Sequence, residues 1–131
     1  MKLLLDTHIW LWSLLDPAKL SRRVASALQN DANELWLSPI SVWEVLMLAE
    51  RGRIVFDRDA VEWVQEARRA APLAEAPLTV EVALATRGLA LRHRDPADAF
   101  LAATAKVFGL TLVTTDRRLL AVPGIRTMPN R

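Results

Sequence analysis

Short apolar runs alternate along this chain with longer stretches in which apolar residues recur at helical spacing. The runs at 2–5, 34–37 and 110–113 predict buried strands, and 125–128 predicts a last edge strand. Because helical stretches separate these runs, we expect the strands to pair in parallel through right-handed crossovers. The alternation therefore predicts an α/β fold built in layers.

Capping and breaking residues mark where the predicted helices begin and end. In the first half of the chain they predict a helix with Ile9, Leu11, Trp12 and Leu15 that ends before Asp16, a helix at 22–30 capped by Ser21, and a helix that starts at Ser38-Pro39 and runs to about Arg51, with a stop at Gly52. A fourth helix is capped by Asp57 and has Val61, Val64 and Ala67 in phase. The last two run from Thr79 through Leu91 and from Asp95-Pro96 to Phe108, with a stop at Gly109. The connector at 71–77 is a candidate for one more short strand, so the sheet has four to five strands.

Composition narrows the class of protein. A chain of 131 residues fits one domain, 1–131, and an apolar fraction of 52% is enough for a packed core. Because there is no cysteine, disulfides and thiolate metal sites are excluded, and any metal must be held by oxygen or imidazole. The net charge of +2 is too small to indicate nucleic-acid binding by itself. The start of the chain lacks a secretory pattern and no apolar stretch has the length of a membrane span, so we expect a soluble cytoplasmic protein with no membrane partner.

Four acidic residues stand at positions that are unusual for a solvated surface. Asp6 and Asp116 come just after the predicted strands at 2–5 and 110–113. Glu44 lies in a largely apolar stretch of helix, and Asp98 lies in the first turn of another helix. Since ligands of parallel α/β sheets bind beyond the carboxyl ends of the strands, we expect the acids to share one site.

Each acid also has an ordinary structural explanation. Asp6 can simply end a strand, and Glu44 can lie on the polar side of an amphipathic helix. Asp98 can balance the helix dipole, and Asp116 can open a turn. Taken one at a time these explanations are favoured, but the four positions together favour a site.

Converging carboxylates repel one another, so such a cluster must take up protons or bind a cation. Mg²⁺ and Mn²⁺ suit oxygen ligands and need only a few carboxylates. An ion of this kind can activate a water and neutralise a phosphodiester in its transition state. The residues therefore permit metal-assisted phosphodiester hydrolysis, although spacing alone does not establish it because the acids come from distant segments.

Four blocks of sequence, in order, resemble those of the PIN-domain family. The blocks are Leu3-Leu4-Leu5-Asp6-Thr7-His8, Ser41-Val42-Trp43-Glu44, His93-Arg94-Asp95-Pro96-Ala97-Asp98 and Leu112-Val113-Thr114-Thr115-Asp116. The resemblance covers essentially the whole chain, and it is strongest to the VapC toxins of bacterial and archaeal toxin–antitoxin pairs. It implies a single PIN-like domain whose parallel sheet is sandwiched by helices.

The same resemblance implies a function and a set of site residues. It implies a Mg²⁺- or Mn²⁺-dependent endoribonuclease that leaves a 5′-phosphate and a 3′-hydroxyl on RNA, a cognate antitoxin that inhibits it, and a homodimer. Asp6, Glu44 and Asp98 match the firmest metal ligands of the family. Asp116 matches the fourth catalytic acid, which acts through water or on a second ion. Thr7 and Thr114 match small polar positions near the site.

Some neighbours of the acids need separate interpretation. Asp95 precedes a proline and is expected to cap a helix rather than bind metal. His8 and His93 are expected to support the site rather than to act as ligands. Ala99 stands where relatives often carry arginine directly after the third acid, which weakens the expectation of one substrate or structural contact.

Arginine and tryptophan side chains leave two questions open. The arginines beside the third and fourth acids either hold RNA phosphates or the antitoxin, or form a solvated rim; they are Arg92, Arg94, Arg117 and Arg118. Trp10 and Trp12 are two apart on a predicted helix and cannot share a face, so one is expected at the surface or in an interface such as a groove for an antitoxin helix.

Two other functions fit the residues less well. A binding module that keeps the fold but has lost catalysis would not need all four acids. A receiver-type phosphoacceptor domain needs a paired acid near the first strand and a lysine late in the chain. The lysines here are Lys2, Lys19 and Lys106, and none follows the last strong strand.

Overall fold

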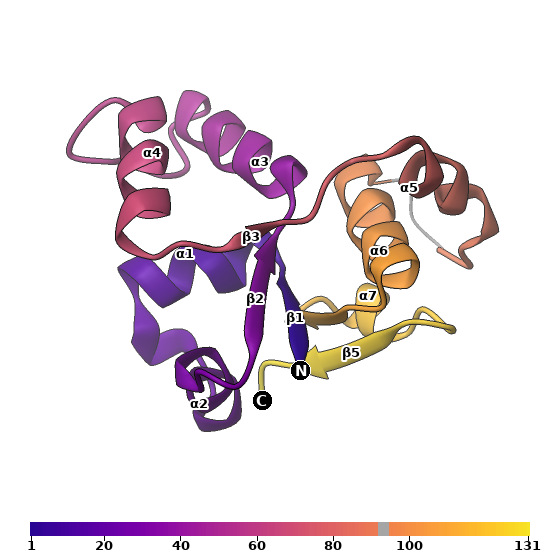
Figure 1. The fold of residues 1–131 in the computed structure, drawn as a ribbon. Helices are drawn as coiled ribbons and strands as arrows, with labels where there is room; N and C mark the ends of the chain where they lie inside the picture. Colours follow the sequence, from indigo (N-terminus) through magenta and orange to yellow (C-terminus); the bar gives the residue numbers. More distant parts are fainter. Residues whose placement is uncertain (92–94) are drawn as a thin grey trace.

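A five-stranded parallel sheet forms the centre of the protein in this computed structural model, which describes residues 1–91 and 95–131 (Figure 1). The strand order is β3-β2-β1-β4-β5, and every pairing is parallel. The strands are β1 (Lys2–Leu5), β2 (Glu34–Leu37), β3 (Ala74–Glu75), β4 (Thr111–Thr114) and β5 (Arg126–Pro129). The predicted α/β class, the parallel sheet and the edge position of the last strand are confirmed. The predictions for Arg92, His93 and Arg94 lie outside the described residues.

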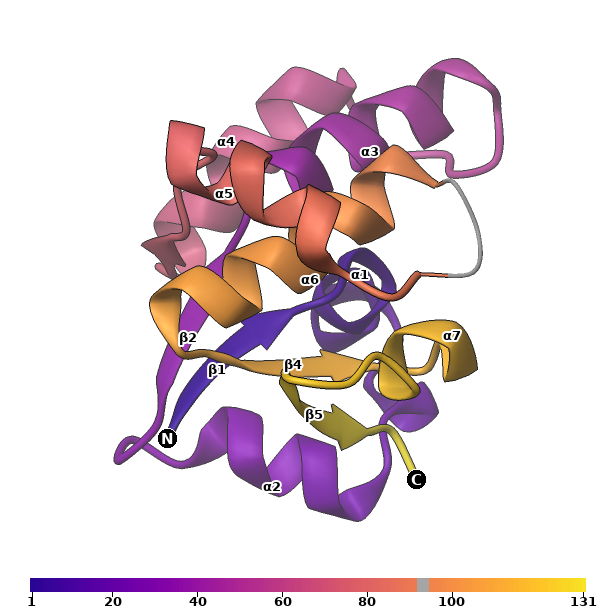
Figure 2. The same ribbon diagram turned by 90° about the vertical axis from the view of Figure 1, so that its right-hand side faces the viewer.

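Helices cover both faces of this sheet (Figures 1 and 2). They are α1 (Thr7–Leu15), α2 (Arg22–Gln29), α3 (Pro39–Glu50), α4 (Ala60–Ala70), α5 (Val80–Ala85), α6 (Pro96–Phe108) and α7 (Arg117–Leu120), with the 3-10 turns η1 (Pro17–Lys19) and η2 (Thr86–Gly88). Apolar residues of α1 to α4 pack into one cluster with the sheet, and residues of α6 and α7 pack into a second. The predicted sandwich of helices around a sheet is confirmed.

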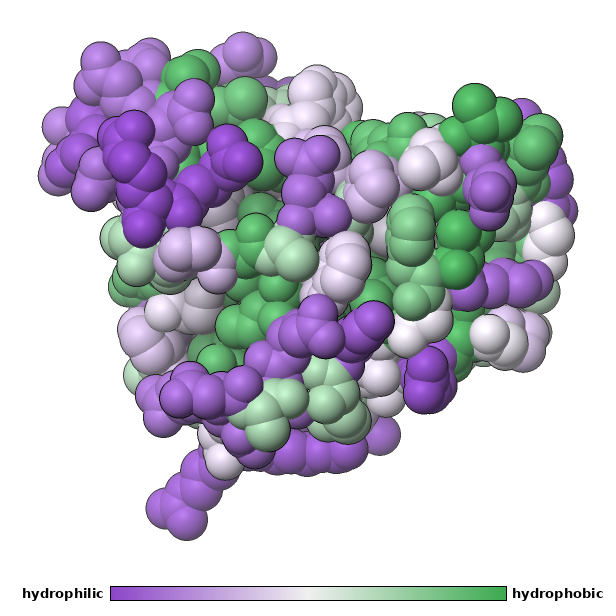
Figure 3. Space-filling model, viewed as in Figure 1, coloured by the Kyte–Doolittle hydropathy of each residue, from purple (hydrophilic) through white to green (hydrophobic). Residues whose placement is uncertain are grey.

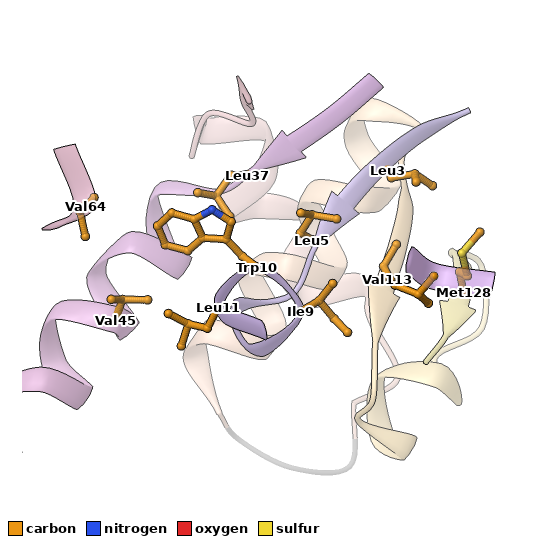
Figure 4. Close-up of a cluster of buried hydrophobic side chains, with 11 residues drawn as sticks. Leu3, Leu5, Ile9, Trp10, Leu11, Leu37, Val45, Val64, Val113 and Met128 are labelled. Carbon is orange, nitrogen blue, oxygen red and sulfur yellow. The ribbon is translucent and has the colours of Figure 1, made fainter. Parts of the chain in front are cut away.

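The central strand β1 shows why an uninterrupted apolar run is needed here. Successive side chains of a strand point to opposite faces, so Leu3 and Leu5 enter the cluster beside α1, and Leu4 enters the cluster beside α6. All three are at most 1% exposed. A strand buried on both faces is apolar at every position, unlike the alternating strands of half-exposed sheets. Figure 4 shows the first cluster, in which Trp10 and Val113 also lie.

Several predicted boundaries hold and others are wrong. Ser21, Ser38, Thr79 and Asp95 cap helices as predicted. The helix α6 ends at Phe108, and its C-cap is Gly109, whose φ of 64° is left-handed. The cap of α4 is Asp59, not Asp57, because the Asp59 carboxylate accepts the Glu62 N–H while Asp57 pairs with Arg58.

Three further corrections concern the later half of the chain. The helix predicted from Thr79 through Leu91 ends at Ala85 and continues only as η2, a tightened turn that contains Gly88. The strand predicted at 110–113 runs one residue later, from Thr111 to Thr114. The short helix α7 was not predicted, and it is the element that Asp116 caps.

Surface features of the described residues complete the fold. Trp10 is 2% exposed whereas Trp12 is partly exposed against His8 and Lys19, as their two-residue spacing on α1 requires. Within 1–91 and 95–131, none of the helices has both the length and the apolar character to cross a membrane. Apolar side chains reach the surface near α5, where Val80 and Leu84 are exposed (Figure 3).

Candidate active site

The acids singled out from the sequence come from four elements around one edge of the sheet. Asp6 directly follows β1 and caps α1, and Asp116 follows β4 and caps α7. Because β1 and β4 pair in parallel with Leu5 opposite Val113, their carboxyl ends lie side by side. Glu44 comes from the middle of α3, and Asp98 comes from the first turn of α6.

Two buried threonines connect three of these acids in one hydrogen-bonded chain. The Thr7 hydroxyl donates to Glu44 Oε1 at 2.7 Å, and the Thr7 backbone N–H donates to Asp6 Oδ1 at 2.8 Å. The Thr114 hydroxyl donates to Asp6 Oδ2 at 2.6 Å and accepts the Asp116 N–H at 3.0 Å. Both threonines are at most 1% exposed, so this chain of hydrogen bonds runs through the buried base of the site.

The electrostatic field of the site opposes ionisation of its deepest acids. Burial raises the pKa of Asp6, and the charge of Asp116 raises it further, although the bonds from Thr114 and Thr7 and the charge of His8 lower it. Burial also raises the pKa of Glu44, and the charges of Asp6, Asp95 and Asp98 add to that rise. A cation placed among these carboxylates would stabilise their ionised forms.

Arg118 supplies positive charge at the outer side of the site. Its guanidinium Nε and Nη2 each lie 3.3 Å from a carboxylate oxygen of Asp116, and its backbone N–H donates to Oδ1 at 2.8 Å. The hydrogen bonds and charge of Asp116 raise the pKa of Arg118, as do the charges of Asp98 and Asp95. One basic side chain therefore lies within the field of the third and fourth acids.

The donor set fits a hard divalent cation, but the side chains are not arranged as a finished metal site. Within the described part of the chain, no three Asp, Glu or His side chains converge so that they could hold a metal ion as they lie. The carboxylate oxygens of Asp6, Glu44 and Asp116 point instead at hydroxyl, amide and guanidinium donors. A carboxylate oxygen has two lone pairs, so these bonds leave room for a ligand bond. Ions such as Mg²⁺ favour oxygen ligands of this kind.

The remaining predicted neighbours take supporting positions. Asp95 is the N-cap of α6, as expected, and its carboxylate accepts the Ala97 N–H at 3.0 Å. His8 is exposed on the first turn of α1, with its ring against Trp12, and its charge reaches Asp6. Arg117 is exposed in α7.

The linking role of the two threonines was not apparent in the sequence by itself. Resemblance indicated only small polar residues at positions 7 and 114. The one local signal is the spacing Thr114-x-Asp116, since a threonine hydroxyl commonly accepts a backbone N–H two residues on.

Comparison with known proteins identifies the family. The sequence profile of the PIN domain matches residues 3–125, which is nearly the whole chain. The chain belongs to the PIN-domain family. Ribonuclease VapC22 of Mycobacterium tuberculosis is 37% identical over 121 residues, with 88% of each chain covered.

Two solved VapBC structures share the fold of this chain. VapBC from Salmonella typhimurium, solved bound to DNA, matches with a TM-score of 0.72 and 19% identity over 100% of this chain and 99% of that one. VapBC2 from Rickettsia felis, bound to a promoter DNA fragment, matches with a TM-score of 0.71 and 15% identity over 98% of both chains. At these identities the similarity establishes the PIN fold of this chain.

Proposed function

We propose that this PIN domain is a metal-dependent endoribonuclease and the toxin of a toxin–antitoxin pair, with residues 1–131 acting as one domain. The observation that carries the proposal is the hydrogen-bonded chain from Glu44 through Asp6 to Asp116, with Asp98 close enough to raise the pKa of Glu44. The 37% identity to a protein named a ribonuclease supports the same activity.

Asp6, Glu44 and Asp98 would hold Mg²⁺ or Mn²⁺, and Asp116 would support the site from α7. When bound, such an ion activates a water for attack on a phosphodiester and neutralises the charge that develops there. Thr7 and Thr114 fix the Asp6 carboxylate on both oxygens, so it cannot rotate away from the site. The guanidinium of Arg118, which bonds Asp116, would contact an RNA phosphate that approaches the acids.

The test is cleavage of single-stranded RNA with added Mg²⁺ or Mn²⁺. Wild type should cut and leave 5′-phosphate and 3′-hydroxyl ends, and Asp98→Asn should lose at least about a hundredfold in rate, as removal of one electrostatic group at an active site commonly does. Asp31→Asn is the matched control, because Asp31 is an exposed aspartate in the turn before β2, at the opposite edge of the sheet. Equal cleavage by wild type and Asp98→Asn would rule out this site.

An antitoxin protein is the proposed partner. An apolar groove of about 430 Å³ lies between α3, α4 and β3, with Val42, Leu46 and Leu73 among its lining residues. An amphipathic helix of the antitoxin would bury its apolar face there. Co-purification with the product of a short reading frame next to the gene, and its loss in Leu46→Arg, would support this partner.

A homodimer and a cytoplasmic location complete the proposal. Leu78, Val80 and Leu84 expose apolar surface on and before α5, which a second copy of the chain would cover. Light scattering of wild type and Leu84→Glu would distinguish a dimer from a monomer. RNA, the proposed substrate, is available in the cytoplasm.

The alternative of a silent binding module predicts a different result. Such a protein would bind the antitoxin but show no heat of Mg²⁺ or Mn²⁺ binding and no RNA cleavage. The described site favours the enzyme. The pKa values of Asp6 and Glu44 are raised, so these acids ionise less readily unless a cation is bound, and a binding module would gain nothing from such a cluster.

A further inference from the structure

A second hollow lies next to the acids, and its lining residues do not include Asp6, Glu44, Asp98 or Asp116. It has a volume of about 590 Å³ and is lined by Thr86 and Arg87 of η2, by Leu89 and Leu91, and by Asp95 and the first turns of α6. Leu89, Leu91 and Phe100 provide apolar walls, and the Arg87 guanidinium provides positive charge. Volumes in this range are typical of sites that bind small organic ligands.

This hollow and the acidic cluster share one turn of helix. Asp95, the N-cap of α6, and Ala99 in the first turns of that helix both line the hollow. Asp98 lies on the same turn, and the charges of both Asp95 and Asp98 act on Glu44 and Arg118. The turn η2 also contacts α6 directly. A molecule bound in the hollow would therefore lie next to a molecule bound at the acids.

The small side chain of Ala99 helps to keep the hollow open. Ala99 is partly exposed and lines the wall, so a longer side chain at this position would project into the space. Apolar walls suit the flat faces of a nucleobase, and an exposed guanidinium suits its phosphate. A nucleotide would use both the apolar walls and Arg87, whereas an apolar ligand would use only the walls.

We propose that this hollow binds one unpaired nucleotide of the RNA beside the bond that is cut, with its base against Leu89, Leu91 and Phe100 and its phosphate at Arg87. The inference rests on the proposed ribonuclease function and assigns these residues a role in choosing the cleavage position. Unpaired RNA is the substrate form that such a subsite requires, because a base within a duplex is stacked and paired.

The experiment separates the contribution of the base from that of the backbone. Binding of fluorescent eight-nucleotide RNAs, made of each of the four bases and of an abasic ribose-phosphate chain, is measured by anisotropy in an Asp98→Asn background. The ratio of affinities for base-containing and abasic RNA reports contacts with bases. Ala99→Phe fills the hollow and should reduce this ratio by about tenfold, near the low end of what one stacked base contributes. Ala32→Phe, at an exposed turn near the opposite edge of the sheet, is its control and should leave the ratio unchanged.

The arginine is tested by the salt dependence of the same binding. Arg87→Ala should weaken binding of base-containing and abasic RNA equally and reduce the slope of log affinity against log salt by about 0.7, the value for one phosphate contact on a single strand. Arg23→Ala removes the same charge from an exposed position on α2 and should leave the slope unchanged. Arg87 is exposed, so its variant tests the proposal even where Ala99→Phe folds poorly.

Failure of this inference can be told from failure of the proposed function. If wild type cleaves RNA but Ala99→Phe and Arg87→Ala bind RNA and choose cleavage positions as their controls do, the subsite is wrong and the ribonuclease stands. If wild type neither cleaves nor binds the RNAs, both are wrong. If the variants lose affinity for the antitoxin and not for RNA, the hollow is a protein contact, which also overturns the inference.

Discussion

Replacing Thr114 with valine tests how much the hydrogen-bonded chain at the base of the site contributes to the stability of the fold. The change keeps the shape of the side chain and removes its hydroxyl, which donates to Asp6 Oδ2 and accepts the Asp116 N–H. A hydrogen bond to a charged group contributes roughly 1.5–3 kcal/mol and a neutral one about 1 kcal/mol. Because Thr114 is fully buried, no water replaces the lost partner. The expected loss in the free energy of unfolding is therefore about 3 kcal/mol.

Thr104→Val is the matched control. Thr104 is equally buried, but its hydroxyl donates to the Phe100 carbonyl one turn earlier in α6 and so does not connect acids of the site. We expect it to lose about 1 kcal/mol or less. By the usual entropy of unfolding for a chain of this length, Thr114→Val should melt about 10 °C below wild type and Thr104→Val about 3 °C below. Urea and thermal unfolding followed by tryptophan fluorescence would measure both.

The pH dependence of this loss follows from the raised pKa of Asp6. A carboxyl group whose pKa is higher in the folded than in the unfolded state favours folding while protonated and loses that contribution as pH rises through its folded pKa. Without the Thr114 hydroxyl the folded pKa of Asp6 rises further, so the deficit of Thr114→Val should be larger at neutral than at acidic pH. Equal stability of the two valine variants, or a deficit that does not change with pH, would refute this account of the site.

Other predictions concern single residues of the site and its helix. Glu44→Gln keeps an acceptor for the Thr7 hydroxyl but removes a carboxyl group whose pKa is raised. Its melting temperature should therefore exceed that of wild type at neutral pH and approach it in acid. A lower melting temperature at pH 7 would contradict the repulsion between Glu44 and the neighbouring acids. Asp95→Ala should lose about 1 kcal/mol as a lost helix cap while Asp95→Asn stays near wild type, and urea unfolding in which both fall equally would exclude capping as the cause. Gly109→Ala should lower the free energy of unfolding by about 1 kcal/mol, because the φ of Gly109 is left-handed. An added Cβ would make an ordinary van der Waals contact with Arg126, so the loss would come from the backbone. No loss would show that α6 can end another way.

The fold followed from local features of the sequence. The uninterrupted leucines at 3–5 predicted a short buried strand, and the caps at Ser38 and Asp95 located two long helices. Apart from the start of α4, which Asp59 caps instead of Asp57, the boundaries that were wrong belong to short elements. The four residues of α7 are too few to show a helical period, and α5 ends early at a turn that contains Gly88.

The site was only partly predictable. Topology indicated that Asp6 and Asp116 share an edge, because both follow parallel strands. The positions of Glu44 and Asp98 in the sequence favoured the same site, and the resemblance to the family strengthened that prediction. The bonds that connect the acids join residues far apart in the chain: Thr7 and Glu44 are 37 positions apart, and Asp6 and Thr114 are 108 apart. No local pattern encodes such pairs. They depend on where α3 and β4 place their residues beside β1, which only the folded structure reveals.

The central claim is that Asp6, Glu44 and Asp98 together form one cation site. Its most direct test is a crystal of the wild-type protein soaked in Mn²⁺, with anomalous diffraction recorded to locate the ion. The account predicts a peak among these three carboxylates in wild type, with Asp116 at its side, and the loss of that peak in Asp98→Asn. A peak elsewhere on the protein, or a peak that persists in Asp98→Asn, would contradict it.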